Sequence, residues 1–152
     1  MIQSVDHINI VVDDLERSVR FYTQVLGLKE TRRAHLEGDW IEAIVGLKGV
    51  VADVVFVVAP NGEPRIELLQ YRSPLGEAMP ATSLRNTIGL RHIAFRVSDI
   101  QKSVAILEEN GVPILSKPVA VPGNVIAHSA GDKQLCYFHD PDGVLLELAQ
   151  YT

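Results

Sequence analysis

Four residues of the sequence combine metal-binding or acid–base side chains with a regular placement. His7 and Glu67 lie in short apolar runs of the first half, and His92 and Glu147 lie at corresponding places in the second. Imidazole and carboxylate groups can ligate a divalent ion, and a carboxylate can also transfer protons. Any one of them alone is more often a solvated or hydrogen-bonded side chain, but two matched pairs indicate a shared site.

The matched positions belong to an internal repeat that covers most of the chain. Segment 5–15 aligns with 90–100, and segment 66–71 aligns with 146–151, each of the last two following a Pro-Asn-Gly or Pro-Asp-Gly turn signal. The stretch 73–89 contains Pro, Ser and Thr and is typical of a linker. The prediction is a single two-module domain over 1–152, with module 1 at about 1–72 and module 2 at about 90–152.

Local patterns predict the same elements in both halves. Apolar residues alternate over 5–12 and 91–97, which indicates strands; a cap at Asp13 or Asp14, or at Ser98 or Asp99, then opens a helix that ends near Gly27 or Gly111. Further strands are predicted at 40–46, 52–59, 65–71, 114–120, 125–128, 134–139 and 144–150. The fold class is therefore α+β, with two βαβββ modules.

Strand alternation places the four chemical residues on the face of each sheet that lacks the helix. Ile8, Ile10 and Val12 share the face that packs on the helix, so His7 points to the opposite side. Two glutamates on one shared face would repel unless a cation or protons compensated them. If the two sheets face each other, the four groups can hold one divalent ion, and the mixed N/O set suits Zn, Ni, Co, Mn or Fe better than Ca.

Composition excludes several other classes of function. The net charge is −5 and no Lys/Arg block exceeds Arg32-Arg33, so no nucleic-acid partner is expected. Apolar runs are too short for a membrane span, and the first residues lack the features of a signal peptide. The single cysteine, Cys136, fits a reducing compartment and is interpreted as a buried, inert thiol. A cytoplasmic protein is expected.

The motifs resemble those of the vicinal oxygen chelate superfamily, which includes glyoxalase I, methylmalonyl-CoA epimerase, extradiol dioxygenases and fosfomycin or bleomycin resistance proteins. They span nearly the whole chain, at 6–8, 20–22, 26–28, 66–68, 91–95 and 140–147. Residues 66–69, 73–74 and 89–94 are similar to the epimerases, whereas Asp140-Pro141-Asp142-Gly143 is closer to glyoxalase I and the resistance proteins.

This resemblance implies paired modules that form a cup-shaped sheet around a metal, with His7, Glu67, His92 and Glu147 as ligands and two positions open for water or substrate. The paired modules belong to one chain in some members and to two chains of a homodimer in others. The expected activity is that of a metal-dependent isomerase or lyase of the glyoxalase I or epimerase type, acting on a small molecule through a metal-chelated enediolate. Glu67 or Glu147 would then move the proton.

Three points remain open in the sequence. Glu42, in the acidic segment 37–42, is a candidate for a separate base, although a solvated loop carboxylate competes with that interpretation. His35, His128 and His139 have no partner in the repeat and are assigned structural or substrate-adjacent places. The same fold would also serve a non-catalytic drug- or metabolite-binding protein, or an iron extradiol dioxygenase, in which a fourth ligand at Glu67 would crowd the oxygen-activating site.

Overall fold

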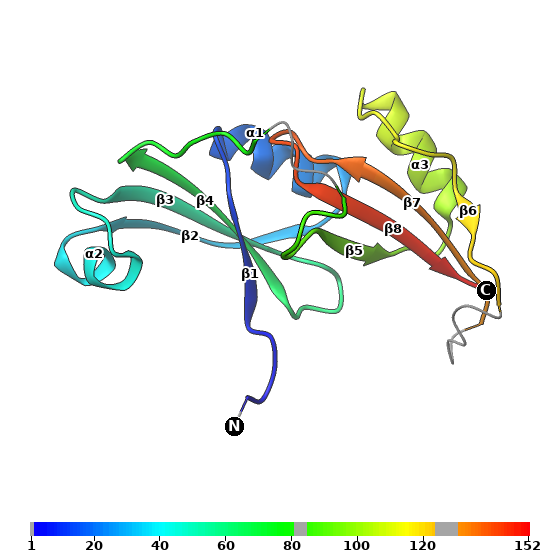
Figure 1. Ribbon diagram of the computed structural model, residues 1–152, viewed down its shortest axis with the longest axis horizontal. Helices are drawn as coiled ribbons and strands as arrows, with labels where there is room; N and C mark the ends of the chain where they lie inside the picture. The colour runs from blue at the N-terminus through cyan, green and yellow to red at the C-terminus, as the bar shows by residue number, and fades with distance from the viewer. Residues whose placement is uncertain (1, 81–84, 124–130) are drawn as a thin grey trace. The chain divides into compact units, whose positions relative to one another are not determined.

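A computed structural model describes residues 2–80, 85–123 and 131–152 of the chain. The chain forms two compact units, Met1–Ala78 and Met79–Thr152 (Figure 1). The boundary between the units lies inside the stretch 73–89. Each unit contains one four-stranded sheet, so both halves of the sequence repeat build the same kind of structure.

The first unit is a βαβββ module with one additional helix. Its sheet has the strand order β1-β4-β3-β2, in which β1 runs parallel to β4 and the other neighbours are antiparallel. The elements are β1 (His7–Val11), α1 (Leu15–Arg20), the π-helical turn η1 (Phe21–Val25), β2 (Lys29–Glu37), α2 (Asp39–Val45), β3 (Val51–Val58) and β4 (Arg65–Ser73).

One predicted element of this unit is wrong. The segment 40–46, predicted as a strand, is helix α2, and the second strand is Lys29–Glu37 instead. The apolar residues Ile41, Ile44 and Val45 recur at helical spacing, and Ile41 is buried. Gly46 ends the helix with φ of 73°. The strand β2 has many exposed polar side chains, so its sequence lacks the apolar alternation that reveals a half-buried strand.

The second unit has the same βαβββ arrangement, but its edge strand β6 is shorter than the equivalent strand β2. Its sheet has the order β5-β8-β7-β6, again with a parallel pair, β5 and β8. The elements are β5 (His92–Arg96), α3 (Ile100–Glu109), β6 (Val119–Ala120), β7 (Lys133–His139) and β8 (Leu145–Tyr151). Of the predicted strand 114–120, only the last two residues and an isolated bridge between Ile114 and Phe138 pair with β7. The predicted strand 125–128 lies outside the described residues.

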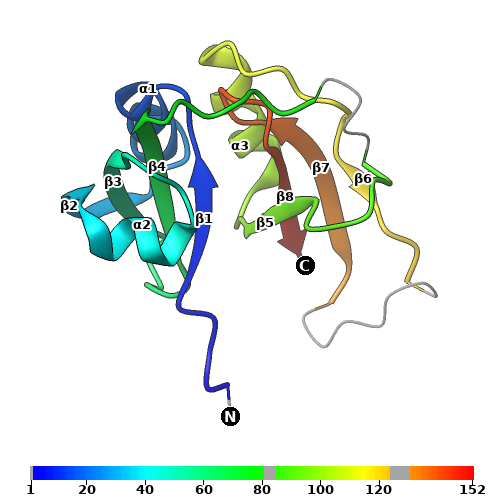
Figure 2. The ribbon, with the colours of Figure 1, turned by 60° about the vertical axis from the view of Figure 1, so that its left-hand side comes forward.

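In each unit the helix that follows the first strand, α1 or α3, packs on one face of the sheet, and the first unit has the further helix α2 (Figure 2). In the first unit Tyr22 and Leu68 are fully buried between helix and sheet, and in the second Leu107 and Leu146 are buried in the same way. Apolar burial of this kind is the main force that holds a helix on a sheet. The histidine and glutamate of each module alternate along the strands with these apolar residues, so they lie on the sheet face opposite α1 or α3, as strand alternation predicts.

The same two polar contacts fix the start of the helix in both units. Asp14 accepts a hydrogen bond from the Arg17 amide at 2.9 Å, and Asp99 accepts one from the Lys102 amide at 3.0 Å, which confirms the predicted caps. Gln70 and Gln150, the repeated glutamines of the last strands, also receive the first helical amides, those of Leu15 and Ile100, at 3.2 and 2.7 Å. The last strand of each module therefore positions the helix that follows the first strand.

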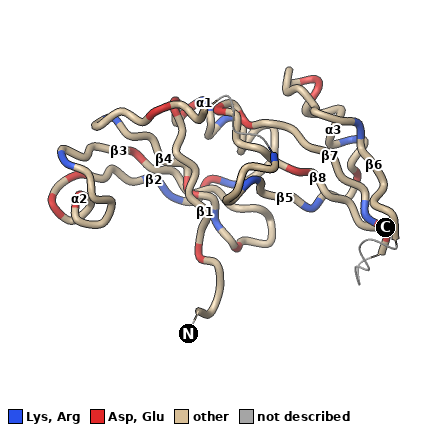
Figure 3. The backbone as a smooth tube through the Cα atoms, in the orientation of Figure 1, with Lys and Arg blue, Asp and Glu red and all other residues tan. Residues whose placement is uncertain are grey.

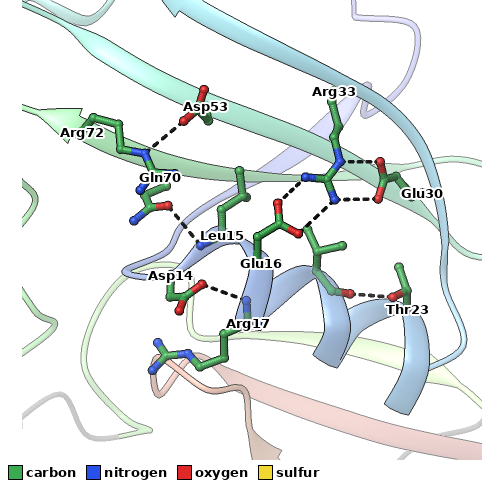
Figure 4. Close-up of polar contacts among 11 residues, drawn as sticks. Asp14, Leu15, Glu16, Arg17, Thr23, Glu30, Arg33, Asp53, Gln70 and Arg72 are labelled. Atoms are coloured by element: carbon green, nitrogen blue, oxygen red, sulfur yellow. Dashed lines mark hydrogen bonds and ion pairs between the residues drawn. The ribbon is translucent and has the colours of Figure 1, made fainter.

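Charged side chains add a second attachment between α1 and the first sheet (Figure 4). The Arg33 guanidinium of β2 bridges the carboxylates of Glu16 on α1 and Glu30 on its own strand. On the neighbouring strands β4 and β3, Arg72 donates to Asp53 at 3.0 Å, and Asp53 also contacts His35 Nδ1 at 2.7 Å. Apart from Glu30, these groups line a hollow of about 290 Å³ beside α1.

Charges of both signs are interspersed along each unit (Figure 3).

Among the described residues, no helix is both long and apolar enough to cross a lipid bilayer.

Candidate metal-binding and proton-transfer site

In the first unit the parallel strands β1 and β4 bring His7 and Glu67 together. Asn9 lies opposite Glu67 in the register, and its side-chain amide donates to Glu67 Oε2 at 2.8 Å. The His7 Nε2 atom lies 3.5 Å from the same oxygen. Both side chains stay partly accessible, with 40% and 18% of their surface exposed. The pair therefore faces outward from the sheet, where a ligand can reach it.

The orientation of the His7 ring is fixed from behind by Asp6. Asp6 Oδ2 lies 2.7 Å from His7 Nδ1, and the same carboxylate is paired with Arg65. The hydrogen bond with His7, supported by Arg65, lowers the pKa of the Asp6 carboxyl, so this group is charged at neutral pH. With Nδ1 held by a carboxylate, Nε2 is left to point at Glu67. This arrangement is common to histidines that ligate metals.

In the second unit β5 and β8 form the equivalent pair. Ala94 lies opposite Glu147, and His92 Nε2 is 3.4 Å from Glu147 Oε2. The His92 side chain is 37% exposed, but Glu147 is almost completely buried, at 3%. A buried carboxylate requires compensation. Lys133 of β7 provides it, since its Nζ lies 2.8 Å from Glu147 Oε1.

Both aromatic and charged neighbours define the chemistry of this second pair. The hydrogen bond with Glu147 raises the pKa of Lys133, which is therefore an ammonium at neutral pH. Burial, together with the charge of Glu147, raises the pKa of Tyr137, whose ring packs edge-on against His92 with centroids 5.4 Å apart. Tyr137 is thus a neutral phenol that can donate but does not serve as a base.

The Asp140-Pro141-Asp142-Gly143 motif builds the turn that leads into β8. Asp140 is buried, and its Oδ1 accepts from the amides of Asp142 and Val144 at 3.0 and 2.8 Å. Gly143 adopts φ of 86°, a conformation that other residues rarely take. The motif therefore acts on Glu147 indirectly, by fixing where the last strand begins.

The spacing of the two donor pairs fits a metal ion. Two ligands about 2.1 Å from one ion, at an angle of about 90–110°, are separated by roughly 3.0–3.4 Å. The observed N···O distances of 3.5 and 3.4 Å lie close to this range. Among the described residues, no group of three or more His, Cys, Asp or Glu side chains forms a complete cluster. The structure thus gives two His–Glu pairs, and the set of four ligands stays a prediction.

The other residues named from the sequence lie elsewhere. Glu42, on α2, accepts hydrogen bonds from Lys48 Nζ at 3.0 Å and from the Gly49 amide at 2.7 Å, and the bond to Lys48 lowers its pKa. His35 faces the hollow beside α1, and His139 ends β7. Cys136 is buried and burial raises its pKa, as expected for an inert thiol. His128 lies outside the described residues.

Sequence reasoning missed the partners of the two glutamates. Strand alternation places Asn9 on the same face as His7, but Asn9 was not named as a site residue. The adjacency of Asp6 to His7 was also a visible signal. The sequence did not point to Lys133, because the first half has no lysine at the equivalent position. Lys133 reaches Glu147 only because β7 and β8 pair side by side.

Comparisons with known proteins agree with this architecture. The chain is 33% identical over 155 residues to an ethylmalonyl-CoA/methylmalonyl-CoA epimerase of Cereibacter sphaeroides, covering 99% of each chain. The crystal structure of a glyoxalase family protein from Bacillus cereus superimposes with a TM-score of 0.83 at 28% identity, covering 99% of this chain and 95% of that one. The trypanothione-dependent glyoxalase I of Leishmania major gives a TM-score of 0.66 at 25% identity, with 97% and 86% covered.

A model of one protein family matches residues 4–148, which is nearly the whole chain. The resemblance drawn from the motifs is thereby confirmed. The chain belongs to the Glyoxalase/Bleomycin resistance protein/Dioxygenase superfamily.

Proposed function

We propose that the protein is a divalent-metal-dependent isomerase of the epimerase type, which moves a proton on a carbon next to a carbonyl group. The observation that carries the proposal is the repeated His Nε2–Glu Oε2 pair, at 3.5 Å in the first unit and 3.4 Å in the second. The metal ligands would be His7, Glu67, His92 and Glu147, supplied by one chain or by two chains of a homodimer. Zn, Ni, Co, Mn and Fe suit this donor set.

When bound, the metal would polarise neighbouring substrate oxygens as a Lewis acid. The residues of the chain would then hold and move the proton. Glu67 is the better candidate for proton transfer, because its carboxylate is more exposed than that of Glu147 and accepts its hydrogen bond from the neutral amide of Asn9. Glu147 is buried and engaged by an ammonium, which favours a fixed ligand.

Glu42 stays a prediction as a separate base. Its carboxylate would have to leave Lys48 and the Gly49 amide before it could accept a substrate proton. Glu67 would have to free one carboxylate oxygen from the metal, but it has no cationic partner like Lys48 to leave among the described residues, so we place the proton transfer there.

The epimerase type is supported by similarity across the whole length of the chain. The Cereibacter relative is named for epimerisation of ethylmalonyl-CoA and methylmalonyl-CoA, and an Actinomyces relative, 28% identical, is named 2-epi-5-epi-valiolone epimerase. Both names describe inversion at a carbon centre. The glyoxalase I type of isomerisation would use the same residues and remains the alternative reaction.

Metal content tests the proposal first. Protein purified without chelators or an affinity tag should contain about one ion per site by elemental analysis, and the content should fall in Glu67→Gln and His92→Ala. Glu109→Gln, at an exposed position near the end of α3, is the matched control and should keep the metal. If neither the parent nor the reconstituted protein binds Zn, Ni, Co, Mn or Fe, the drug- or metabolite-binding alternative replaces the enzyme.

The reaction is tested next with the metal-loaded protein. Racemic methylmalonyl-CoA and a hemithioacetal are incubated in deuterated buffer, and proton NMR follows loss of the proton next to the carbonyl. Exchange with the acyl-CoA would support an epimerase, whereas conversion of the hemithioacetal alone would support the glyoxalase type.

A further inference from the structure

The second unit holds a cation at its candidate metal ligand already. Lys133 Nζ lies 2.8 Å from Glu147 Oε1, while His92 Nε2 lies 3.4 Å from the other oxygen of the same carboxylate. Only 16% of the Lys133 side chain and 3% of the Glu147 side chain are exposed. An ion pair with this little solvent contact is screened weakly and has few competing water partners.

This lysine breaks the symmetry of the repeat. On the third strand of the first sheet, Ala52 lies opposite Tyr71, and on the corresponding strand of the second sheet Lys133 lies opposite Tyr151. The first unit therefore has a methyl group where the second has an ammonium. The Lys133 side chain runs past the Tyr151 ring, with Nζ 5.8 Å from its centroid, to reach Glu147. Its position thus depends on two contacts, which both lie on the face of the second sheet opposite α3.

We infer that Lys133 is an internal competitor of the metal at Glu147 and sets how tightly the site binds divalent ions. This inference rests on the proposed function, in which Glu147 is a ligand. A divalent ion and an ammonium cannot share one carboxylate without repulsion, so the ion must displace Lys133 from Oε1 or bind beside it at a cost. Binding of the metal is then an exchange of one cation for another.

The ion pair also has a consequence for the stability of the metal-free protein. Removal of one partner from a buried ion pair leaves the other charge uncompensated and destabilises the fold. With Lys133 present, Glu147 is compensated in the metal-free protein. The lysine therefore stabilises the metal-free state at the expense of the loaded one, and it lowers metal affinity by doing so.

Affinity measurements on the whole chain test this inference. Apparent dissociation constants for Co²⁺ and Zn²⁺ are measured by competition with a chromophoric chelator, for the parent, Lys133→Met and Lys133→Arg. Methionine keeps the apolar stem without the charge, and arginine keeps the charge. We expect Lys133→Met to bind both ions on the order of tenfold more tightly, the scale on which neighbours of metal ligands act, and Lys133→Arg to bind like the parent.

Lys48→Met is the matched control, because Lys48 is also paired with a glutamate, Glu42, but is 93% exposed and remote in sequence from both pairs. It should leave the affinity unchanged. Melting temperatures give a second readout: Lys133→Met should melt below the parent without metal and should gain more than the parent when Co²⁺ is added. This comparison detects a variant that has simply lost its fold.

The outcomes separate the inference from the proposed function. Equal or weaker binding by a folded Lys133→Met, with clear binding by the parent, overturns the inference and leaves the metal site standing. Binding by Lys133→Met alone supports it in its strongest form. Failure of both proteins to bind Co²⁺ or Zn²⁺ overturns the inference together with the proposed function.

Discussion

The two units place the same histidine–glutamate pair on the same framework but surround it differently. In the first unit Glu67 is partly exposed and receives a hydrogen bond from the neutral amide of Asn9. In the second, Glu147 is buried and is paired with the charged Lys133. Each unit has an alanine at the position where the other has its polar partner: Ala94 corresponds to Asn9, and Ala52 corresponds to Lys133. A duplicated site can therefore give its two carboxylates different roles by changing one neighbour of each.

The largest expected difference between the units concerns turnover. Glu67→Gln should lower kcat for exchange of the proton next to the carbonyl by about 10²–10⁴-fold, because an amide cannot accept that proton. Glu147→Gln should act mainly through lost metal. Deuterium exchange is measured together with metal content, at saturating metal. Full turnover in loaded Glu67→Gln, with turnover lost in loaded Glu147→Gln, would reverse the two roles.

A smaller difference is expected from the carboxylate behind His7. Asp6→Asn should weaken metal affinity by about 10–100-fold, because Asp6 orients the imidazole and supports it as a ligand. Asp13→Asn, a nearby exposed aspartate, is the control and should have no effect on the dissociation constant. An unchanged affinity in Asp6→Asn would show that metal binding by His7 does not depend on this contact.

The repeated glutamines allow a comparison of stability. Gln70→Ala and Gln150→Ala should each lower the free energy of unfolding by about 1 kcal/mol, the usual scale for a lost hydrogen bond. Gln70 also donates to the Asp13 carbonyl, so its loss should cost more than that of Gln150. Urea unfolding, followed by circular dichroism, measures both values. A larger effect of Gln150→Ala would contradict this order.

The smallest expected effect is a pH dependence confined to the first unit. The hydrogen bond with Asp53, and a weaker contact with Glu37, raise the pKa of His35 above its usual value of 6.5. A raised pKa in the folded state stabilises the protein fully below pH of about 6.5, and this contribution is lost as the pH rises through the folded value. The difference in melting temperature between the parent and His35→Gln should therefore shrink from pH 6 to pH 8. A constant difference would mean that the protonated form of His35 adds nothing.

Much of the fold was visible in the sequence because both halves carry the same signals. Caps at Asp14 and Asp99, alternation in the first strands and the turns before the last strands all predicted the elements that the structure has. The strand Lys29–Glu37 was missed because most of its side chains are polar and exposed, so alternation carries no information there. The helix Asp39–Val45 was mistaken for a strand because a short apolar run does not distinguish the two.

The site was predictable as far as residues repeat and no further. His7, Glu67, His92 and Glu147 were named from symmetry, and within each unit the structure brings the named histidine and glutamate together. Lys133 could not be named in this way, because its contact with Glu147 comes from a neighbouring strand and from a long, flexible side chain. The combination of the two pairs into one metal centre also lies beyond what strand periodicity can determine.

The parallel pairing of the first and last strands has a consequence for the order of assembly. Asn9 and Glu67 are separated by 58 residues, and the hydrogen bond between them closes a loop that includes every other element of the unit. Contacts of such high sequence separation are entropically costly and form late in folding. On a ribosome, the first histidine must wait for β4 to emerge before it meets its glutamate, and the second waits for the last strand of the chain. Each pair thus reports that its own unit has finished folding.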